Sequence, residues 1–211
     1  MRSPILHPHS NRPLPGRRRA TALLVAATLA LALGGCIRLG AGKPPASLLT
    51  LTASQALAPG NGSSGKGEDA LVVYDPEVDR TLAVQRVAVT VDPSNVAYLK
   101  DALWVERPAR LFGALLAETI RARGKQLVFA ADDRAALSQR RLTGRLLAMG
   151  YDAGSHAVVV RYDAVRSESG KLATRRFESR VPVARADAET VGPALNAAAN
   201  AVAGEVADWI G

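Results

Sequence analysis

The sequence predicts an α+β domain in which a mainly antiparallel sheet carries two helices on one face. Three observations lead to this fold class. Apolar residues recur at helical spacing in two stretches, 108–123 and 187–210, and they alternate with polar residues in several shorter stretches. Short turn-forming segments separate the alternating stretches. Because the order is strands, helix, strands, helix, we expect both helices to cover the same side of one sheet.

The region before the first helix contains four segments of strand-like composition. Ser47–Ala53, Ala70–Asp75 and Leu82–Val91 are rich in Val, Leu and Thr. Val96–Glu106 is expected to be extended, with a turn near Lys100 and Asp101. Between the first two segments, residues 54–69 are rich in Gly, Ser, Asn and Pro, a composition that predicts a flexible loop because it can bury little apolar surface.

The clearest helix is predicted over 108–123. Pro108 suits the first turn, and Gly124 suits the position that follows the last one. Arg121 and Arg123 are well placed at the negative end of the helix dipole. One apolar stripe at helical spacing is expected to face the core: Leu111, Phe112, Leu115, Leu116, Thr119 and Ile120.

The second half of the chain predicts an antiparallel meander and a closing helix. Gln126–Ala130 is a brief strand, and 141–151, 156–166 and 172–183 are longer strands joined by hairpin-length turns. Asp187 is a suitable N-cap for the last helix. The inward strand residues should be Leu147, Met149, Tyr151, Val158, Val160, Tyr162, Ala164, Phe177, Ser179, Val181 and Val183, and the helix should bury Val191, Leu195, Ala198, Val202, Val206, Trp209 and Ile210.

Residues 1–35 have the organisation of a secretory signal. Five arginines and no acidic residue precede Ala20–Leu33, which is apolar and uncharged. This run is shorter than the roughly 20 residues that a membrane-spanning helix needs. The single cysteine, Cys36, follows Gly34 and Gly35 directly, so an internal disulfide is excluded. We therefore predict a signal peptide over residues 1–35.

The run Leu33-Gly34-Gly35-Cys36 resembles the lipobox of bacterial lipoproteins. The resemblance implies lipid transfer to Cys36, cleavage between Gly35 and Cys36, and acylation of the new N-terminus, with palmitate as the expected acyl group. Residues 36–46, which contain Gly and Pro, are then a tether. Ile37 stands where Asp would imply retention at the inner membrane, so we expect an outer-membrane protein that faces the periplasm. The alternative is an ordinary secreted protein with one stray cysteine.

Charge argues against nucleic acid as a partner. The whole chain has 27 Lys and Arg against 19 Asp and Glu, a net charge of +8. Five of the basic residues precede Cys36, so 22 remain against 19 after cleavage, a net charge of +3. The basic isoelectric point of the whole chain, about 10.2, therefore mostly reflects the signal segment.

The chain offers no set of residues for catalysis. Gly60 to Lys66 matches the start of a phosphate-binding loop, but Gly67 stands where Ser or Thr is required. His156 is the one histidine after Cys36, and a solvated turn residue is its expected role. Asp132 and Asp133 lack the third ligand and glycine spacing of a calcium loop, so they are expected to cap a turn. We expect a protein that is not an enzyme, with no cofactor and no metal.

Three surface features are candidates for partner contacts. Tyr98 and Trp104 are two of few aromatic residues, and either could contact a partner, although core packing is the favoured role for Trp104. A basic cluster of Arg140, Arg141 and Arg145 could face lipid headgroups or an acidic partner, with a solvated strand face as the simpler interpretation.

Residues 45–211 resemble the auxiliary lipoproteins of ABC-type transport systems, which accompany Mce-type and Mla-type lipid transporters and include the paraquat-inducible lipoprotein. The similarity lies in strand and helix signatures rather than in catalytic motifs. The matching stretches are Pro45–Leu51, Ala70–Val73, Gln85–Val89, Val96–Tyr98, Ala102–Trp104, Leu111–Ile120, Arg175–Glu178 and Val206–Trp209.

The resemblance implies a non-catalytic accessory subunit beside an Mce-domain protein, a permease and an ATPase. Such a complex would move phospholipid or another hydrophobic molecule across the envelope. The resemblance identifies no catalytic residue in this chain, and it is compatible with a homo-oligomer. Two alternatives remain: an assembly lipoprotein for outer-membrane or lipopolysaccharide machinery, and a lipid carrier with an apolar cavity.

Overall fold

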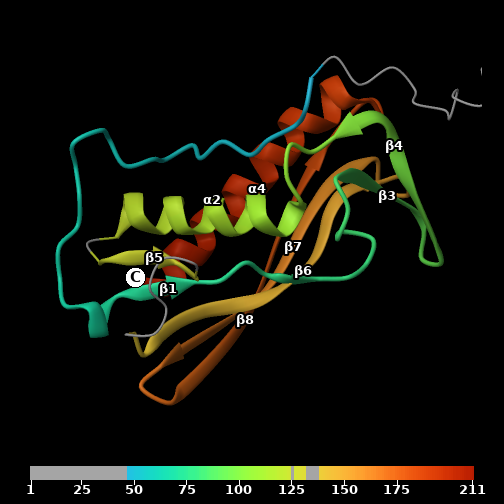
Figure 1. Ribbon diagram of the computed structural model, residues 1–211. Coiled ribbons are helices and arrows are strands. Elements are labelled where there is room, and N and C mark those ends of the chain that lie inside the picture. Colours follow the sequence, from blue (N-terminus) through green and yellow to red (C-terminus); the bar gives the residue numbers. More distant parts are fainter. Residues whose placement is uncertain (1–46, 125, 132–137) are drawn as a thin grey trace, which may run out of the picture. The chain divides into compact units, whose positions relative to one another are not determined.

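The computed structural model describes residues 47–124, 126–131 and 138–211, which all belong to one compact unit, Pro45–Gly211. Its eight-stranded sheet carries helices α2 (Pro108–Arg123) and α4 (Ala188–Ile210) (Figure 1). The predicted α+β fold class is confirmed. Gly35, Cys36, the expected tether over 36–46, and the pair Asp132 and Asp133 lie outside the described residues.

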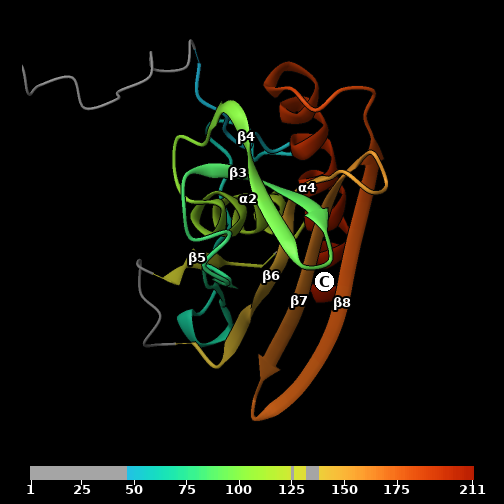
Figure 2. The ribbon, with the colours of Figure 1, turned by 90° about the vertical axis from the view of Figure 1, so that its right-hand side faces the viewer.

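The sheet is built around one long strand, β6 (Arg140–Asp152). On one side β6 pairs antiparallel with β7 (Ala157–Glu168), and β7 pairs antiparallel with β8 (Lys171–Pro182). These three strands are the predicted meander, and together they form the most regular part of the sheet (Figure 2).

The other side of β6 receives three shorter strands one after another, all of them parallel to it. These are β1 (Leu71–Val73), β2 (Glu77–Val78) and β3 (Arg86–Asp92). Strand β5 (Val128–Ala130) pairs parallel with β1, and β4 (Asn95–Leu103) pairs antiparallel with β3. The sheet is therefore mainly antiparallel by extent, with a parallel region that the sequence did not predict.

The register of β6 corrects one predicted inward residue. A bulge between Leu146 and Ala148 shifts the pairing with β7 by one residue. Leu142 and Leu146 therefore face the core before the bulge, and Met149 and Tyr151 face it afterwards. Leu147, which was expected to share the face of Met149, is only half-buried.

The core fills the layer between the sheet and both helices. Helix α2 buries Phe112, Leu115, Leu116, Thr119 and Ile120 as predicted. The ring of Phe112 meets that of Tyr162 on β7 edge to face, with centroids 5.3 Å apart. In α4 the predicted stripe is buried except for Trp209, which is half-buried.

Helix α4 begins as predicted. The Asp187 side chain accepts a hydrogen bond of 2.8 Å from the backbone N–H of Thr190, which satisfies one of the free donors of the first turn. Hydrogen bonding by the Thr190 side chain, followed by this backbone bond, holds the pKa of Asp187 below its usual value.

Residues 49–57, which we name the strap, run over the helices instead of forming the predicted first strand (Figure 1). Leu49 makes one isolated parallel bridge with Trp104, and no strand forms over Ser47–Ala53. The side chain of Asn200 on α4 accepts from the backbone N–H of Ser54 (2.7 Å) and donates to the carbonyl of Thr52 (2.9 Å). Further hydrogen bonds join Thr52 to Asn196, Leu57 to Glu118 and Gln55 to Arg123.

The predicted loop over 54–69 starts within the strap and ends in a short 3-10 helix, η1 (Gly67–Asp69). Its first residues are tied to α2 and α4 by the hydrogen bonds just described. The flexibility of its remainder stays a prediction.

Candidate functional site

The described residues contain little that resembles a catalytic centre. They include no group of three His, Cys, Asp or Glu side chains that could hold a metal ion. His156 lies in a turn with a positive φ of 50°, and its Nδ1 atom is 3.2 Å from the hydroxyl of Tyr151. Within this part of the chain, no helix has the length and apolar character needed to cross a bilayer.

The β3–β4 hairpin exposes two apolar side chains of the sheet. Val91 is 47% exposed and Val96 is 49% exposed, although both lie within strands. Asp92 fixes the turn between the strands by accepting from the backbone N–H of Ser94 (2.8 Å) and from the side chain of Asn95 (2.7 Å). The hydrogen bond from Asn95, followed by that from Ser94, holds the pKa of Asp92 below its usual value.

Tyr98 is positioned on this hairpin. Its ring is half-buried, and the guanidinium of Arg86 stands 4.5 Å from the ring centroid. The hydroxyl group donates a long hydrogen bond of 3.4 Å to the carbonyl oxygen of Thr81. The ring is therefore held in place and still reaches the surface.

Trp104 has a different environment. Its side chain is 2% exposed and belongs to the hydrophobic core. The indole N–H has no hydrogen-bond acceptor among the described residues. This burial supports the core-packing role that the sequence favoured for Trp104. Tyr98 and Trp104 lie in neighbouring segments, but they do not form one exposed surface.

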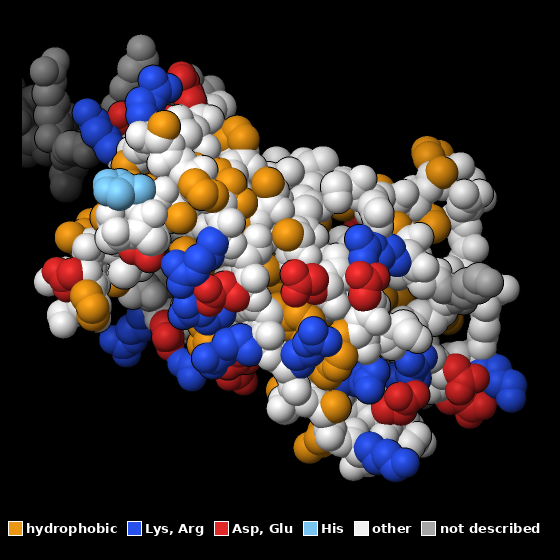
Figure 3. Space-filling view, turned by 180° about the vertical axis from the view of Figure 1, so that it is seen from behind, with side chains coloured by type: hydrophobic (Ala, Val, Ile, Leu, Met, Phe, Trp, Pro, Cys, Tyr) orange, Lys and Arg blue, Asp and Glu red, His pale blue; other side chains and the backbone are white. Residues whose placement is uncertain are grey.

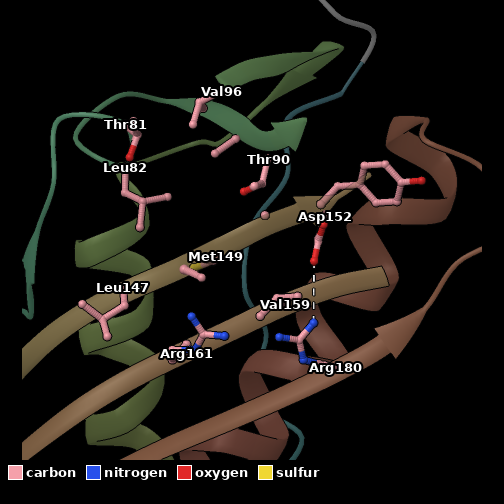
Figure 4. A pocket seen from close by; sticks show the side chains of 14 residues that line it. Thr81, Leu82, Thr90, Val96, Leu147, Met149, Asp152, Val159, Arg161 and Arg180 are labelled. Carbon is pink, nitrogen blue, oxygen red and sulfur yellow. Dashed lines mark ion pairs between the residues drawn. The ribbon is translucent and has the colours of Figure 1, made fainter. Parts of the chain in front are cut away.

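A cavity of about 170 Å³ lies beneath the hairpin, on the face of the sheet that points away from the helices (Figure 4). Its floor is made of small residues: Ala88, Ala148 and Gly150. A Cβ atom at Gly150 would overlap the carbonyl oxygen of Ala88, so glycine permits β3 to approach β6 here. Apolar and charged side chains form the walls: Leu82, Val96, Leu147, Met149, Val159, Asp152, Arg161 and Arg180.

The charged wall of the cavity is an ion-pair network across β6, β7 and β8. Glu178 accepts hydrogen bonds from both Arg161 and Arg180, the latter at 2.6 Å, and Arg180 lies 3.6 Å from Asp152. The bond from Arg161 is the main cause that holds the pKa of Glu178 below its usual value. For Asp152 the largest cause of its lowered pKa is the hydroxyl of Ser155. The positive charges of Arg161 and Arg180 are therefore balanced by the carboxylates of Glu178 and Asp152.

The sequence patterns alone do not identify Val159, Arg161 or Arg180 as cavity residues. For Val159 the sequence does contain a signal. Val158, Val159 and Val160 are consecutive, and a half-buried strand should have only alternate apolar residues. Val159 is 6% exposed on the outer face, because the hairpin covers it. The two arginines gave no such signal, because their partners come from other strands.

An ion pair beside the cavity gives a pH-dependent prediction. Arg176 donates two hydrogen bonds to Asp163, of 2.6 and 2.7 Å, and the first cause of the lowered pKa of Asp163 is this contact. A lowered folded-state pKa stabilises the fold above the unfolded value near 4, and that contribution disappears as pH falls. Because the pair is well exposed, we expect Asp163→Asn to lower the free energy of unfolding by less than about 1 kcal/mol at neutral pH.

Urea unfolding of the parent and of Asp163→Asn at pH 7 and at about pH 3 measures this effect. The difference between the two proteins should shrink at the lower pH. Arg176→Gln is the matched control, because it removes the other partner and should give a similar loss at pH 7. A difference of the same size at both pH values would contradict the assignment.

Comparisons with known proteins agree with this architecture. A family model described as ABC-type transport auxiliary lipoprotein component matches residues 49–207. The crystal structure of protein XCC0632 from Xanthomonas campestris, assigned to the family DUF330, has a TM-score of 0.64 at 20% identity and covers 77% of this chain and 94% of that one.

A crystal structure of an uncharacterized protein has a TM-score of 0.60 at 15% identity, covering 68% of this chain and 93% of that one. At these identities the two structures support the fold alone. No relative was found among proteins with curated descriptions.

Proposed function

We propose that this chain, which belongs to the family of ABC-type transport auxiliary lipoprotein components, is a lipid-anchored docking subunit of an Mce-type transport system. In this proposal Cys36 carries the lipid, and residues 36–46 link it to the folded domain. The domain faces the periplasm from the outer membrane and contacts the Mce-domain protein, which works with a permease and an ATPase. The match of the family model over residues 49–207 is the observation that carries the proposal.

The edge strands favour the β3–β4 hairpin as the contact with the partner. Strand β4 is the last strand on its side of the sheet, and Asn95–Leu99 contains no charged residue. Exposed edges are usually protected by charged side chains. The edge strand β8 is protected in this way by Lys171, Arg175, Arg176, Glu178 and Arg180. The unprotected edge next to Tyr98 and Val96 is therefore the surface we assign to the partner.

Site-specific photo-crosslinking in the native envelope tests this proposal. A photoreactive phenylalanine at Val96 should capture the Mce-domain protein or another transporter subunit. The same group at Thr174, which is exposed on β8, is the matched control and should capture neither. Capture of outer-membrane assembly proteins alone, or equal capture from both positions, would contradict the proposed docking role.

The location is tested separately by labelling and fractionation. We expect radioactive palmitate to be incorporated by the parent and not by Cys36→Ser, and the labelled protein to fractionate with outer membranes. Recovery in inner membranes would contradict the proposed sorting without affecting the assignment of the hairpin.

A further inference from the structure

We propose that the end of the β7–β8 hairpin binds the surface of an anionic phospholipid membrane. This end is defined by four basic residues and one leucine: Arg141, Arg166, Lys171, Leu172 and Arg175. The inference does not depend on the identity of the transporter partner, and it concerns a part of the domain far from the β3–β4 hairpin (Figure 1).

The first observation is an exposed aliphatic side chain at a tip. Leu172 is 72% exposed, more than any other large hydrophobic residue among those described. It follows the two-residue turn Ser169-Gly170, in which both residues have positive φ values. Cross-strand pairing places Leu172 opposite Ser167, and Ser167 is itself opposite Arg141 on β6. The leucine is therefore presented close to a tight turn, in the same cross-strand row as Arg141, which lies two strands away.

The second observation is an excess of positive charge. Arg141 and Lys171 are exposed and have no carboxylate within ion-pair distance among the described residues. Arg166 donates to the carbonyl of Trp209 (2.9 Å) and lies over its ring, and Arg175 lies over the ring of Phe177. These contacts satisfy the two guanidinium groups without cancelling their charge.

Three carboxylates near this end are engaged by other basic residues. Glu168 on the same hairpin pairs with Arg140 at 3.0 Å, and Asp208 near the end of α4 pairs with Arg123 at 2.7 Å. On η1, Glu68 faces Lys66 at 3.7 Å. Figure 3 shows the molecule from behind, with basic and acidic side chains interspersed over that face.

An anionic membrane fits these two observations better than an acidic protein does. Basic side chains near a negative lipid surface contribute about fivefold each in binding, which corresponds to about 1 kcal/mol. A projecting aliphatic side chain then enters the boundary between headgroups and acyl chains. An acidic protein would use the same charges but has no need of an isolated leucine at the tip.

The end of the β7–β8 hairpin lies far from the strap along helix α4. The strap contacts α4 near its start, where Leu49 would meet a Cβ atom at Gly192, whereas Arg166 contacts the last turn of α4. These points, Gly192 and Trp209, are separated by most of a 23-residue helix, or about 25 Å. The domain therefore has one attachment at the strap and a second membrane contact at the opposite end.

Vesicle binding by the chain from Ile37 onward tests the proposal without the lipid anchor. All core residues and the apolar residues packed on them lie between Leu49 and Ile210, so this chain retains its complete core. The probe is a vesicle of three parts phosphatidylcholine to one part phosphatidylglycerol, compared with pure phosphatidylcholine. We expect binding to the first that weakens with salt, and little binding to the second.

The variant Arg141→Gln with Lys171→Gln should weaken this binding about 25-fold, and Leu172→Ser should weaken it further. The matched control is Lys100→Gln with Arg107→Gln, which removes the same charge from exposed positions at the other end of the domain and should leave binding unchanged. Absence of binding that depends on phosphatidylglycerol, or equal losses in both double variants, would overturn the proposal. Retention on immobilised polyglutamate without vesicle binding would also overturn it, in favour of an acidic protein partner.

Discussion

Trp104→Ala is expected to lower the free energy of unfolding by about 3–5 kcal/mol. The indole ring is 2% exposed and packs in the hydrophobic core beside the strap, so its removal leaves a large cavity. Stability of natural domains is about 5–15 kcal/mol, and the variant should therefore approach the limit of folding. Chemical denaturation followed by circular dichroism measures the loss.

Two controls separate core packing from a surface role. Trp104→Phe should be much milder, because the indole N–H has no acceptor among the described residues to leave unpaired. Tyr98→Ala should have a small effect on stability and reduce crosslinking from the β3–β4 hairpin. A stable Trp104→Ala variant that loses partner capture would contradict the assignment of Trp104 to the core.

Gly144→Ala is expected to cost about 2–5 kcal/mol, a large effect for the addition of one methyl group. Gly144 has a φ of 155°, and a Cβ atom there would overlap the carbonyl oxygen of Asp163 and the ring of Tyr162. The Tyr162 ring cannot move easily, because its hydroxyl donates to the carbonyl of Thr143 (2.8 Å) and the ring packs on Phe112.

The matched control is the same substitution at Gly154. A Cβ atom at that turn would come no closer than 3.4 Å to its nearest neighbour, the carboxylate of Asp152. We expect Gly154→Ala to change stability by less than about 0.5 kcal/mol. Thermal unfolding of both variants under the same conditions compares them, and similar melting temperatures would contradict the role given to Gly144.

Local sequence patterns predicted the helices and the long strands well. The stripe from Leu111 to Ile120 and the cap at Asp187 are properties of a few neighbouring residues, so they can be read without knowing the partner surface. The alternation in Val158, Val160, Tyr162 and Ala164 identified the buried face of β7 for the same reason.

Features that depend on distant segments were not predictable in this way. Hydrogen bonds from backbone N–H groups of the strap to the side chains of Asn196 and Asn200 join residues more than 140 positions apart. The bulge beside Leu147 and the parallel pairing of β1, β2 and β3 with β6 arise from the three-dimensional arrangement. Of the candidate site, Tyr98 was found from composition, whereas the cavity walls were not, because their side chains meet across several strands.

The strap also determines how mechanical load enters the domain. A pull on the proposed lipid anchor reaches the fold first at Leu49 and then acts along the strap, where several hydrogen bonds to α2 and α4 share the force. If these bonds break, the chain between Leu49 and Leu71 is released. The link between the membrane and the domain then lengthens by about 22 residues, or up to about 75 Å when extended. The strap would detach before the sheet and the two helices unfold, and its detachment would protect the domain from the pull.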